Sequence, residues 1–130
     1  MRKLAQMLLD AKIPYLWLNF SDGKLKDPPK NFYNLPLTLD IQNYIQKADY
    51  LVQLSTRESF GNSVLEALIN QLPVICTPIP AFKDFKVEDG VNAHIVPFDM
   101  DFDVYKLLDK PIFFYEYDNE KRVCQWLEII

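Results

Sequence analysis

The stretch that decides the fold is "ADYLVQLSTRESFGNSVLEALINQLPVI", Ala48 to Ile75. It contains a short apolar run, Tyr50 to Leu54, whose composition predicts a buried strand. Ser63 to Asn70 then shows the residue spacing of a helix. The apolar side of this helix carries Val64, Leu65, Leu68 and Ile69. Pro73 to Cys76 supplies another apolar run, so the stretch predicts a strand, a helix and a second strand.

The same alternation extends from this stretch in both directions. Further strands are predicted at Ile13 to Phe20, Phe32 to Leu35 and Ala93 to Val96. Further helices are predicted over the first dozen residues, after Thr38 or Asp40, around Phe82 to Lys86, from Asp103 to Leu108, and over the end of the sequence, "DNEKRVCQWLEII". Short apolar strands that alternate with helices are typical of a parallel sheet covered on both faces, because such strands meet no water on either side. We therefore predict an α/β fold with a parallel sheet of about five strands, built as one domain over residues 1–130.

Composition and charge exclude several classes of protein. The 130 residues are 49% hydrophobic and 25% charged, which is the composition of a globular domain. The net charge of -4, with basic residues scattered among acids, argues against a nucleic-acid binder. Cys76 and Cys124 lie far apart, so we expect buried thiols and a reducing, cytoplasmic location. No apolar run reaches the length of a membrane span, and the basic start "MRKLAQMLLD" is interrupted too early for a secretory signal.

The candidate site lies between the predicted strand and helix of the deciding stretch. In a parallel sheet, ligands bind beyond the carboxyl ends of the strands, and Ser55 to Asn62 lies there. A helix that begins near Ser63 would point its unpaired N–H groups at this edge, which suits a phosphate. Gly61 has no side chain to block the approach. Glu58 precedes the turn, and its carboxylate can accept two hydrogen bonds from adjacent sugar hydroxyls.

Glu66, one turn into the same helix, allows two interpretations. Its carboxylate can reach a second diol, such as a ribose, at the other end of the ligand. Alternatively, "SVLE" is a capping box, in which Ser63 caps the helix and Glu66 bonds back to the N-cap amide. Spacing alone does not decide between a ligand contact and a helix cap. With Glu58 as the other acid, the first interpretation predicts a site that spans a nucleotide sugar.

The motifs of this region resemble a known family. "ADYLVQLS", "ESFGNSVLEALINQLPVI" and "EDGVNAHIVP" follow one another as in the carboxyl-terminal domain of retaining glycosyltransferases of the GT-B fold, the glycosyltransferase family 4 type. The resemblance covers Asn31 to Pro97. It implies a Rossmann-like parallel sheet with helices on both faces, matching the C-terminal half of a GT-B fold.

The resemblance also implies roles for the residues of the turn. Glu58 would hold the donor-sugar hydroxyls as the acid of the catalytic site, and Glu66 would hold the nucleotide ribose. The backbone at Phe60, Gly61 and Asn62 would approach the sugar and the diphosphate. Family members of this kind usually need no metal and no cofactor besides the nucleotide-sugar donor, such as a UDP- or GDP-sugar, because helix dipoles and basic side chains stabilise the leaving diphosphate.

The region before the first predicted helix departs from the family pattern. The family has a further strand there, with an arginine and a lysine for the diphosphate, and an amino-terminal domain that binds the acceptor. We therefore expect a donor-binding domain or fragment of a hexosyltransferase of polysaccharide biosynthesis, inactive alone, which acts with the missing domain or a partner subunit. The alternative is a non-catalytic GT-B-like module that stabilises or regulates a partner glycosyltransferase. Peripheral membrane association of the full enzyme and homo-oligomers are compatible with the sequence.

Single residues complete these expectations. The family usually has glycine where Gln71 and Ala93 stand. Candidate contacts for the base are Leu35, Pro36 and Leu37. Basic residues that could lie near the site, without matching the family's basic pair, are Arg57, Lys83 and Lys86. We expect His94 to be a hydrogen-bonded structural residue, and Tyr115 and Tyr117 to pack under the last helix.

Overall fold

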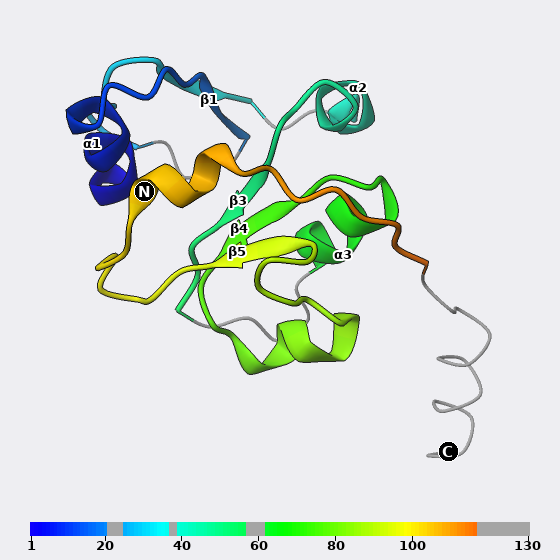
Figure 1. The fold of residues 1–130 in the computed structure, drawn as a ribbon. Helices are drawn as coiled ribbons and strands as arrows, with labels where there is room; N and C mark the ends of the chain where they lie inside the picture. The colour runs from blue at the N-terminus through cyan, green and yellow to red at the C-terminus, as the bar shows by residue number, and fades with distance from the viewer. Residues whose placement is uncertain (21–24, 37–38, 57–61, 117–130) are drawn as a thin grey trace.

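The computed structural model of the protein describes residues 1–20, 25–36, 39–56 and 62–116. Its helices are α1 (Arg2–Asp10), α2 (Ile41–Ile45) and α3 (Asn62–Ile69), with the 3-10 helices η1 (Pro80–Phe85) and η2 (Val104–Leu108). Its strands are β1 (Trp17–Phe20), β2 (Phe32–Leu35), β3 (Leu51–Gln53), β4 (Val74–Cys76) and β5 (Ala93–Ile95). Each element overlaps the segment predicted for it (Figure 1). Two parts of the sequence prediction lie outside the described residues: the terminal helix, which contains Cys124, and the aromatic residue Tyr117.

All paired strands run parallel, which confirms the predicted α/β class. β1 pairs with β2, with Trp17 opposite Phe32, and β4 pairs with both β3 and β5. The strands therefore divide into a two-stranded sheet, β1-β2, and a three-stranded sheet, β3-β4-β5. In Figure 1, β1 is set apart from β3, whereas β3, β4 and β5 lie close together.

β4 is the strand around which the core is built. All of its residues are buried, and both of its edges are hydrogen-bonded. Val74 and Cys76 point to one face of the sheet, where α3 and η1 cover them. Each large apolar side chain buried on this face contributes about 1.5–3 kcal/mol to stability. The buried residues here are Ile45, Val64, Ala67, Leu68, Leu72, Val74, Cys76, Ile79, Phe82, Phe85, Val87, Ala93 and Tyr115.

A second cluster covers the opposite face of the sheet. Ile75 points there, because side chains alternate along a strand. Leu4 and Leu8 of α1 bury in this cluster together with residues of η2. Trp17 of β1 and Val52 of β3 pack against the same cluster, so α1 lies over both sheets. Figure 1 shows the resulting layers, with η2 above the strands β3 to β5 and η1 below them.

β1 and β3 are less buried than their apolar sequences predict. Ile13 to Phe20 and Tyr50 to Leu54 predict buried strands, but every residue of β1 and of β3 is only half-buried. The prediction of burial is therefore wrong for these two strands, although the strands themselves are confirmed. Pairing on one edge does not explain the difference, because β5 is also paired on one edge only among the described residues and has two buried residues of three.

The apolar side of α3 differs from the predicted one. The helix begins at Asn62, one residue earlier than predicted. Val64, Ala67 and Leu68 are completely buried, whereas Ile69 is 49% exposed. Residues three and four apart share a helix face, so the buried stripe runs through Val64, Ala67 and Leu68 and turns Ile69 towards solvent.

The helices α1 and α3 are each followed by a residue with a left-handed backbone conformation, and neither of these residues is glycine. After α3, Gln71 has φ of 59°, and the N–H groups of Gln71 and Leu72 donate to the carbonyls of Leu68 and Ala67. Lys12 has φ of 58° after α1, with the equivalent pair of bonds. This is the Schellman arrangement, whose left-handed position favours glycine.

The Gln71 side chain has a structural role that glycine could not fill. Its Oε1 accepts from the Tyr115 N–H at 2.7 Å, and its Nε2 donates to the Tyr115 carbonyl at 2.9 Å. Tyr115 is buried, and its hydroxyl donates to the Phe85 carbonyl at 2.8 Å. The helix under which it was predicted to pack lies outside the described residues. Gln71 and Phe85 thus fasten the last described segment to the domain.

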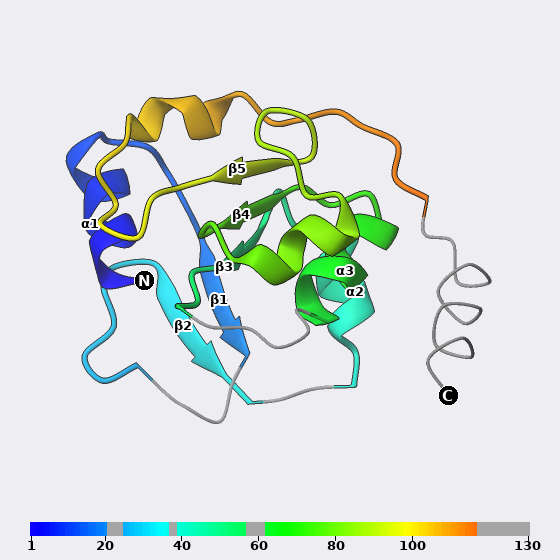
Figure 2. The same ribbon diagram turned by 90° about the horizontal axis from the view of Figure 1, so that it is seen from below.

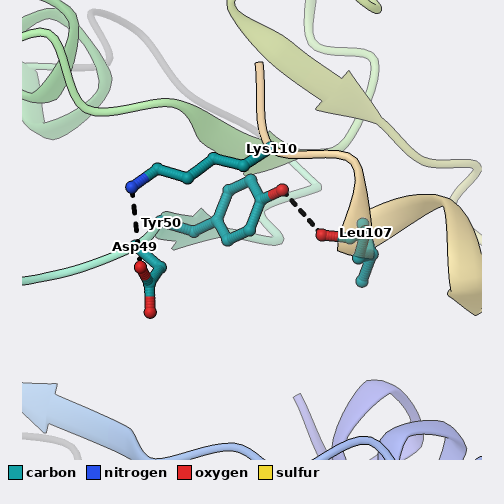
Figure 3. A network of polar contacts seen from close by, with 4 residues as sticks. All are labelled: Asp49, Tyr50, Leu107 and Lys110. Atoms are coloured by element: carbon teal, nitrogen blue, oxygen red, sulfur yellow. Dashed lines mark hydrogen bonds and ion pairs between the residues drawn. The ribbon is translucent and has the colours of Figure 1, made fainter. Parts of the chain in front are cut away.

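Tyr50, just before β3, ties the segment of η2 to the sheet (Figure 3). Its hydroxyl donates to the Leu107 carbonyl at 2.7 Å, and beside it Lys110 Nζ lies 3.5 Å from Asp49 Oδ1. The ion pair is exposed to solvent and adds little stability. Burial, assisted by the negative charges of Asp49 and Asp109, raises the pKa of Tyr50 to about 12. The hydroxyl therefore remains a hydrogen-bond donor at neutral pH.

Two substitutions at Gln71 should distinguish the stability that its side-chain hydrogen bonds contribute from the stability that its left-handed backbone costs. Gln71→Ala removes both bonds to Tyr115 and keeps the unfavourable φ, so we expect the free energy of unfolding to fall by about 1–2 kcal/mol. Gln71→Gly removes the same bonds but relieves the left-handed strain, so it should be more stable than Gln71→Ala by roughly 1 kcal/mol. Urea denaturation measures both values. An alanine variant as stable as the glycine variant would contradict the strain argument.

Tyr50→Phe should change both the stability and its pH dependence. Loss of the bond to Leu107 should cost about 0.5–1.5 kcal/mol of unfolding free energy at neutral pH. Unfolded tyrosine has a pKa of 10.0, whereas folded Tyr50 has a pKa of about 12, so the natural chain binds this proton more tightly when folded. Its stability should therefore fall as the pH rises from 10 towards 12. Urea denaturation across this range should show a smaller fall for Tyr50→Phe, and equal falls would contradict the raised pKa.

Candidate functional site

The carboxyl end of β3, where the predicted donor-binding turn begins, is fastened to the end of β4. The Thr77 N–H donates to the Gln53 carbonyl at 3.4 Å, and the Thr77 hydroxyl donates to the Ser55 carbonyl. Gln53 Nε2 also donates to Ser55 Oγ at 2.7 Å. Thr77 is buried, so these bonds are shielded from water. They fix the point at which the chain leaves the sheet towards α3.

Glu66 lies in the second turn of α3 and faces α2. Gln42 Nε2, on α2, donates to Glu66 Oε1 at 2.6 Å. Ser63 is already the second residue of the helix and is not its cap. The capping-box interpretation is therefore wrong, because the helix starts too early and the Glu66 carboxylate is held sideways by a neighbouring helix.

The Glu66 carboxylate keeps most of its capacity to accept hydrogen bonds. A carboxylate has about four acceptor positions on its two oxygens. Among the described residues, Gln42 alone donates to this side chain. The Glu66 side chain is half-buried, so water or a ligand can still reach it. Its chemistry thus suits a pair of adjacent hydroxyl groups.

α2 holds Gln42 in place by contacts on both of its sides. The helix begins after its N-cap residue Asp40, as predicted, while Thr38 lies outside the described residues. The Tyr44 ring lies 4.7 Å from the Phe20 ring at the end of β1. Ile45 is buried in the core that α3 covers. α2 therefore connects the carboxyl end of β1 with the helix that carries Glu66.

The other predicted site residues are only partly placed. Outside the described residues lie Glu58, Phe60, Gly61, Arg57 and Leu37. Asn62 is placed through its backbone as the first residue of α3. Leu35 ends β2 and is half-buried, and Pro36 follows it on the surface. The structure thus brings Glu66, the start of α3 and the end of β2 to the carboxyl side of the sheets.

Lys86 and His94 lie away from this candidate site. Asn92 Nδ2 donates to the Lys86 carbonyl at 2.9 Å, and the Asn92 carbonyl accepts from Val74 at the start of β4. Lys86 is therefore at the amino edge of the sheet, and the suggestion that it lies near the site is wrong. Lys83 is exposed on η1. His94 is buried and donates from Nε2 to the Asp109 carbonyl at 2.9 Å, which confirms its structural role.

Two residues of this region were missed by the sequence argument. Thr77 is a polar residue directly after the apolar run of β4, a position that marks the ligand-binding edge of a parallel sheet and so could have been noticed. Gln42 carries no such signal, because it is one of several exposed polar residues on a short helix. Its role depends on how α2 packs against α3, which a local pattern does not contain.

Cys76, the free cysteine of the described residues, is a buried thiol. Burial, together with the nearby charge of Asp89, raises the pKa of Cys76 to about 12. Since the thiolate is the nucleophilic form, this residue is inert at neutral pH. Across the described ranges, no three His, Cys, Asp or Glu side chains gather as metal ligands. Within the same ranges, no helix has the length and apolar character needed to cross a bilayer.

Comparison with known proteins assigns the family. The family of glycosyl transferases group 1 matches residues 29–107, from just before β2 into η2. This span contains α2, α3 and the turn between β3 and α3, and therefore the whole candidate site. No curated protein and no solved structure matched the chain. Since the match covers more than half of the chain, the protein belongs to the glycosyl transferases group 1 family.

Proposed function

We propose that the chain is the donor-binding domain of a retaining glycosyltransferase of the glycosyltransferase family 4 type. It would bind a nucleotide sugar, such as a UDP- or GDP-sugar, whose sugar is transferred to a glycan, a lipid or another acceptor. The observation that carries the proposal is the Glu66 carboxylate, which Gln42 orients and which keeps acceptor positions for a diol. Membership of the family supports the class of reaction.

In this proposal the nucleoside end of the donor lies between α3 and α2. The ribose hydroxyls donate to Glu66, and the base lies beyond them, near Leu35, Pro36 and Leu37. The contact between Gln42 and Glu66 supports this arrangement, because it holds α3 against the helix that follows β2. An apolar surface at Leu35 and Pro36 suits the flat face of a base.

The diphosphate and the sugar would occupy the turn before α3. The amino end of α3 would present backbone N–H groups and the positive end of the helix dipole, which stabilises an anion by about 0.3–1 kcal/mol. Glu58 would act in the catalytic site by holding the sugar hydroxyls, and the backbone at Phe60, Gly61 and Asn62 would approach the diphosphate. Thr77 supports this scheme, because it fixes the end of β3 from which the turn departs. In this scheme the helix dipole and basic side chains, with no metal ion, stabilise the leaving diphosphate.

We further propose that transfer requires a second polypeptide unit. Donor and acceptor must be held together with water excluded, normally by closure of two domains. The additional unit, an amino-terminal domain or a partner subunit, would bind the acceptor and supply the arginine and lysine for the diphosphate. The setting that we propose is hexosyl transfer in polysaccharide biosynthesis in the cytoplasm, on an enzyme that can associate peripherally with a membrane.

Donor binding through Glu66 can be tested by isothermal titration of the chain with a panel of UDP- and GDP-sugars. We expect one base to be preferred, and Glu66→Gln to weaken binding about 10- to 100-fold, because hydrogen bonds to a charged group contribute about 1.5–3 kcal/mol. The matched control is Glu88→Gln, the same change on an exposed residue before β5, at the amino edge of the sheet. This control should bind as the natural chain does.

Three results would count against the proposed function. If no sugar nucleotide binds, the chain is a non-catalytic module of the same fold and not a donor-binding domain. If Glu66→Gln binds as tightly as Glu88→Gln, the Glu66 carboxylate does not hold the donor, and the observation that carries the proposal no longer supports it. Sugar transfer by the chain without any added polypeptide would instead refute the requirement for a second unit.

Gln42 is expected to act on the donor only through Glu66. Gln42→Ala removes a single exposed hydrogen bond, so donor binding should weaken by about 2- to 10-fold, with little change in the free energy of unfolding. Gln46→Ala is the matched control, because Gln46 is an exposed glutamine at the end of the same helix. Titration and urea denaturation of both variants separate the two effects. Unchanged or tighter binding by Gln42→Ala would show that Gln42 does not position Glu66 for the donor.

A further inference from the structure

Positive charge is concentrated in one part of the fold. Residues 1–20 and 25–36 contain five basic residues and two acidic ones, a net charge of +3, although the whole chain carries -4. These residues form α1, the sheet β1-β2 and most of the connection between the two strands. A charge asymmetry of this kind between parts of a chain indicates contact with an anionic partner.

The connection between β1 and β2 is held beside α1. At the start of the helix, Arg2 Nη1 donates to the Asp27 carbonyl at 2.6 Å. Beyond the end of the helix, the Tyr15 hydroxyl donates to the Lys30 carbonyl. Residues 25–31 therefore follow α1 along its length (Figure 1).

Two further features fix the backbone of this connection. Asn34 of β2 accepts from the Leu25 N–H at 3.1 Å and donates to the Leu25 carbonyl at 2.9 Å. Two consecutive prolines lie between Lys26 and Lys30, and each proline ring fixes its own φ. The two lysines are thus carried by a backbone that is held at several points.

Four exposed basic residues share this surface, which we call the basic face: Arg2, Lys12, Lys26 and Lys30. Within the described ranges, none of the four forms an ion pair with a carboxylate. Lys3 is not included, because its Nζ donates to the Asp99 carbonyl at 2.6 Å and so lies towards the loop before η2. The acidic residues of this part are Asp10 and Asp27, so the basic face keeps an excess of positive charge.

An exposed leucine lies beside the basic face. Leu16 is 68% exposed and directly follows Tyr15, whose hydroxyl is bonded to the Lys30 backbone. Lys12 precedes the same turn between α1 and β1. Cations beside an exposed apolar side chain suit the surface of an anionic bilayer, where the cations meet lipid phosphates and the apolar group enters the boundary of the acyl chains. A soluble polyanion would use the charges but not the leucine.

The basic face lies away from the candidate site. α1 buries Leu4 and Leu8 on one face of the three-stranded sheet, whereas α3, which carries Glu66, covers the other face. Figure 2 shows α1 and residues 25–31 at one side of the molecule and α3 at the other. A flat surface against the basic face would therefore leave Glu66 open to a ligand from solution.

We propose that the basic face binds the anionic headgroups of a phospholipid membrane, with Leu16 entering the interface. The side chains of the basic face lie against the lipid phosphates, and salt screens this attraction. The inference gives the membrane association proposed above a definite surface and a class of lipid. It does not depend on donor binding, because its test contains no sugar nucleotide.

Sedimentation of the chain with lipid vesicles tests the proposal. The vesicles consist either of phosphatidylcholine alone or of phosphatidylcholine with about one-third phosphatidylglycerol, which is anionic. At low salt we expect binding to the anionic vesicles and none to the neutral ones. Binding should weaken at least about tenfold in about 0.5 M salt, because charges are then screened beyond a few ångströms.

A pair of lysine substitutions locates the binding surface. Lys26→Gln with Lys30→Gln should weaken binding to the anionic vesicles about 10- to 30-fold, since each basic residue near such a surface contributes about fivefold. The chain should still fold, because the change leaves the backbone bond to Tyr15 in place. The matched control is Lys83→Gln with Lys86→Gln, which removes the same charge from two exposed lysines at η1, on the other face of the sheet. This control should bind as the natural chain does.

A serine substitution tests the apolar part of the proposal. Leu16→Ser should weaken binding to the anionic vesicles about 3- to 10-fold, because membrane binding increases with the apolar area that is buried. Ile112→Ser is the control, since Ile112 is 98% exposed in the segment that Gln71 fastens near α3. It should leave binding unchanged.

Four results would overturn the proposal. Absence of binding to anionic vesicles at low salt, or equal binding to neutral ones, would refute an anionic membrane as the partner. Equal binding by the two lysine variants would show that the basic face is not the surface used, and equal binding by Leu16→Ser and Ile112→Ser would refute the entry of Leu16. Binding of dextran sulfate through Lys26 and Lys30, without binding to anionic vesicles, would assign the basic face to a soluble polyanion.

Discussion

The pairing of β4 on both edges is the constraint on which the rest of the structure depends. Because β4 is bonded to β3 and β5, its three side chains must alternate between two covered faces. Val74 and Cys76 organise the core beneath α3 and η1, and Ile75 organises the core beneath α1 and η2. The parallel direction of the three strands then brings their carboxyl ends to one edge, which is where Thr77 and the turn before α3 lie.

The sheet β1-β2 is held to this core in a different way. Among the described residues, side-chain packing joins it to the three-stranded sheet, through Trp17 against the cluster of α1 and through Phe20 against Tyr44 of α2. Packing of this kind fixes a strand less firmly than a continuous ladder does, because it is not directional.

Local sequence patterns predicted the positions of the helices and strands better than they predicted how these elements are buried and what they contact. β2 lies at the predicted residues, Phe32 to Leu35, because Pro36 stops the apolar run. Apolar composition does not report how completely other elements cover a strand, so burial was predicted for β1 and β3 as for β4, although only β4 is buried throughout. The helix ends at Lys12 and Gln71 lack the glycine that marks a left-handed residue, so the sequence pattern does not reveal their left-handed backbone. For the site, the sequence identified Glu66 as a candidate ligand contact, but the choice against a helix cap required the contact with Gln42.

α2 links both sheets to the candidate site. Tyr44 contacts the end of β1, while Gln42, on the same short helix, holds the Glu66 carboxylate on α3. α2 packs at once against the end of β1, through Tyr44, and into the core that α3 covers, through Ile45. The hydrogen bond between Gln42 and Glu66 depends on this double packing, because its geometry tolerates a change of only a few tenths of an ångström. The orientation of the proposed ribose contact is therefore set by how one short helix packs against β1 and α3.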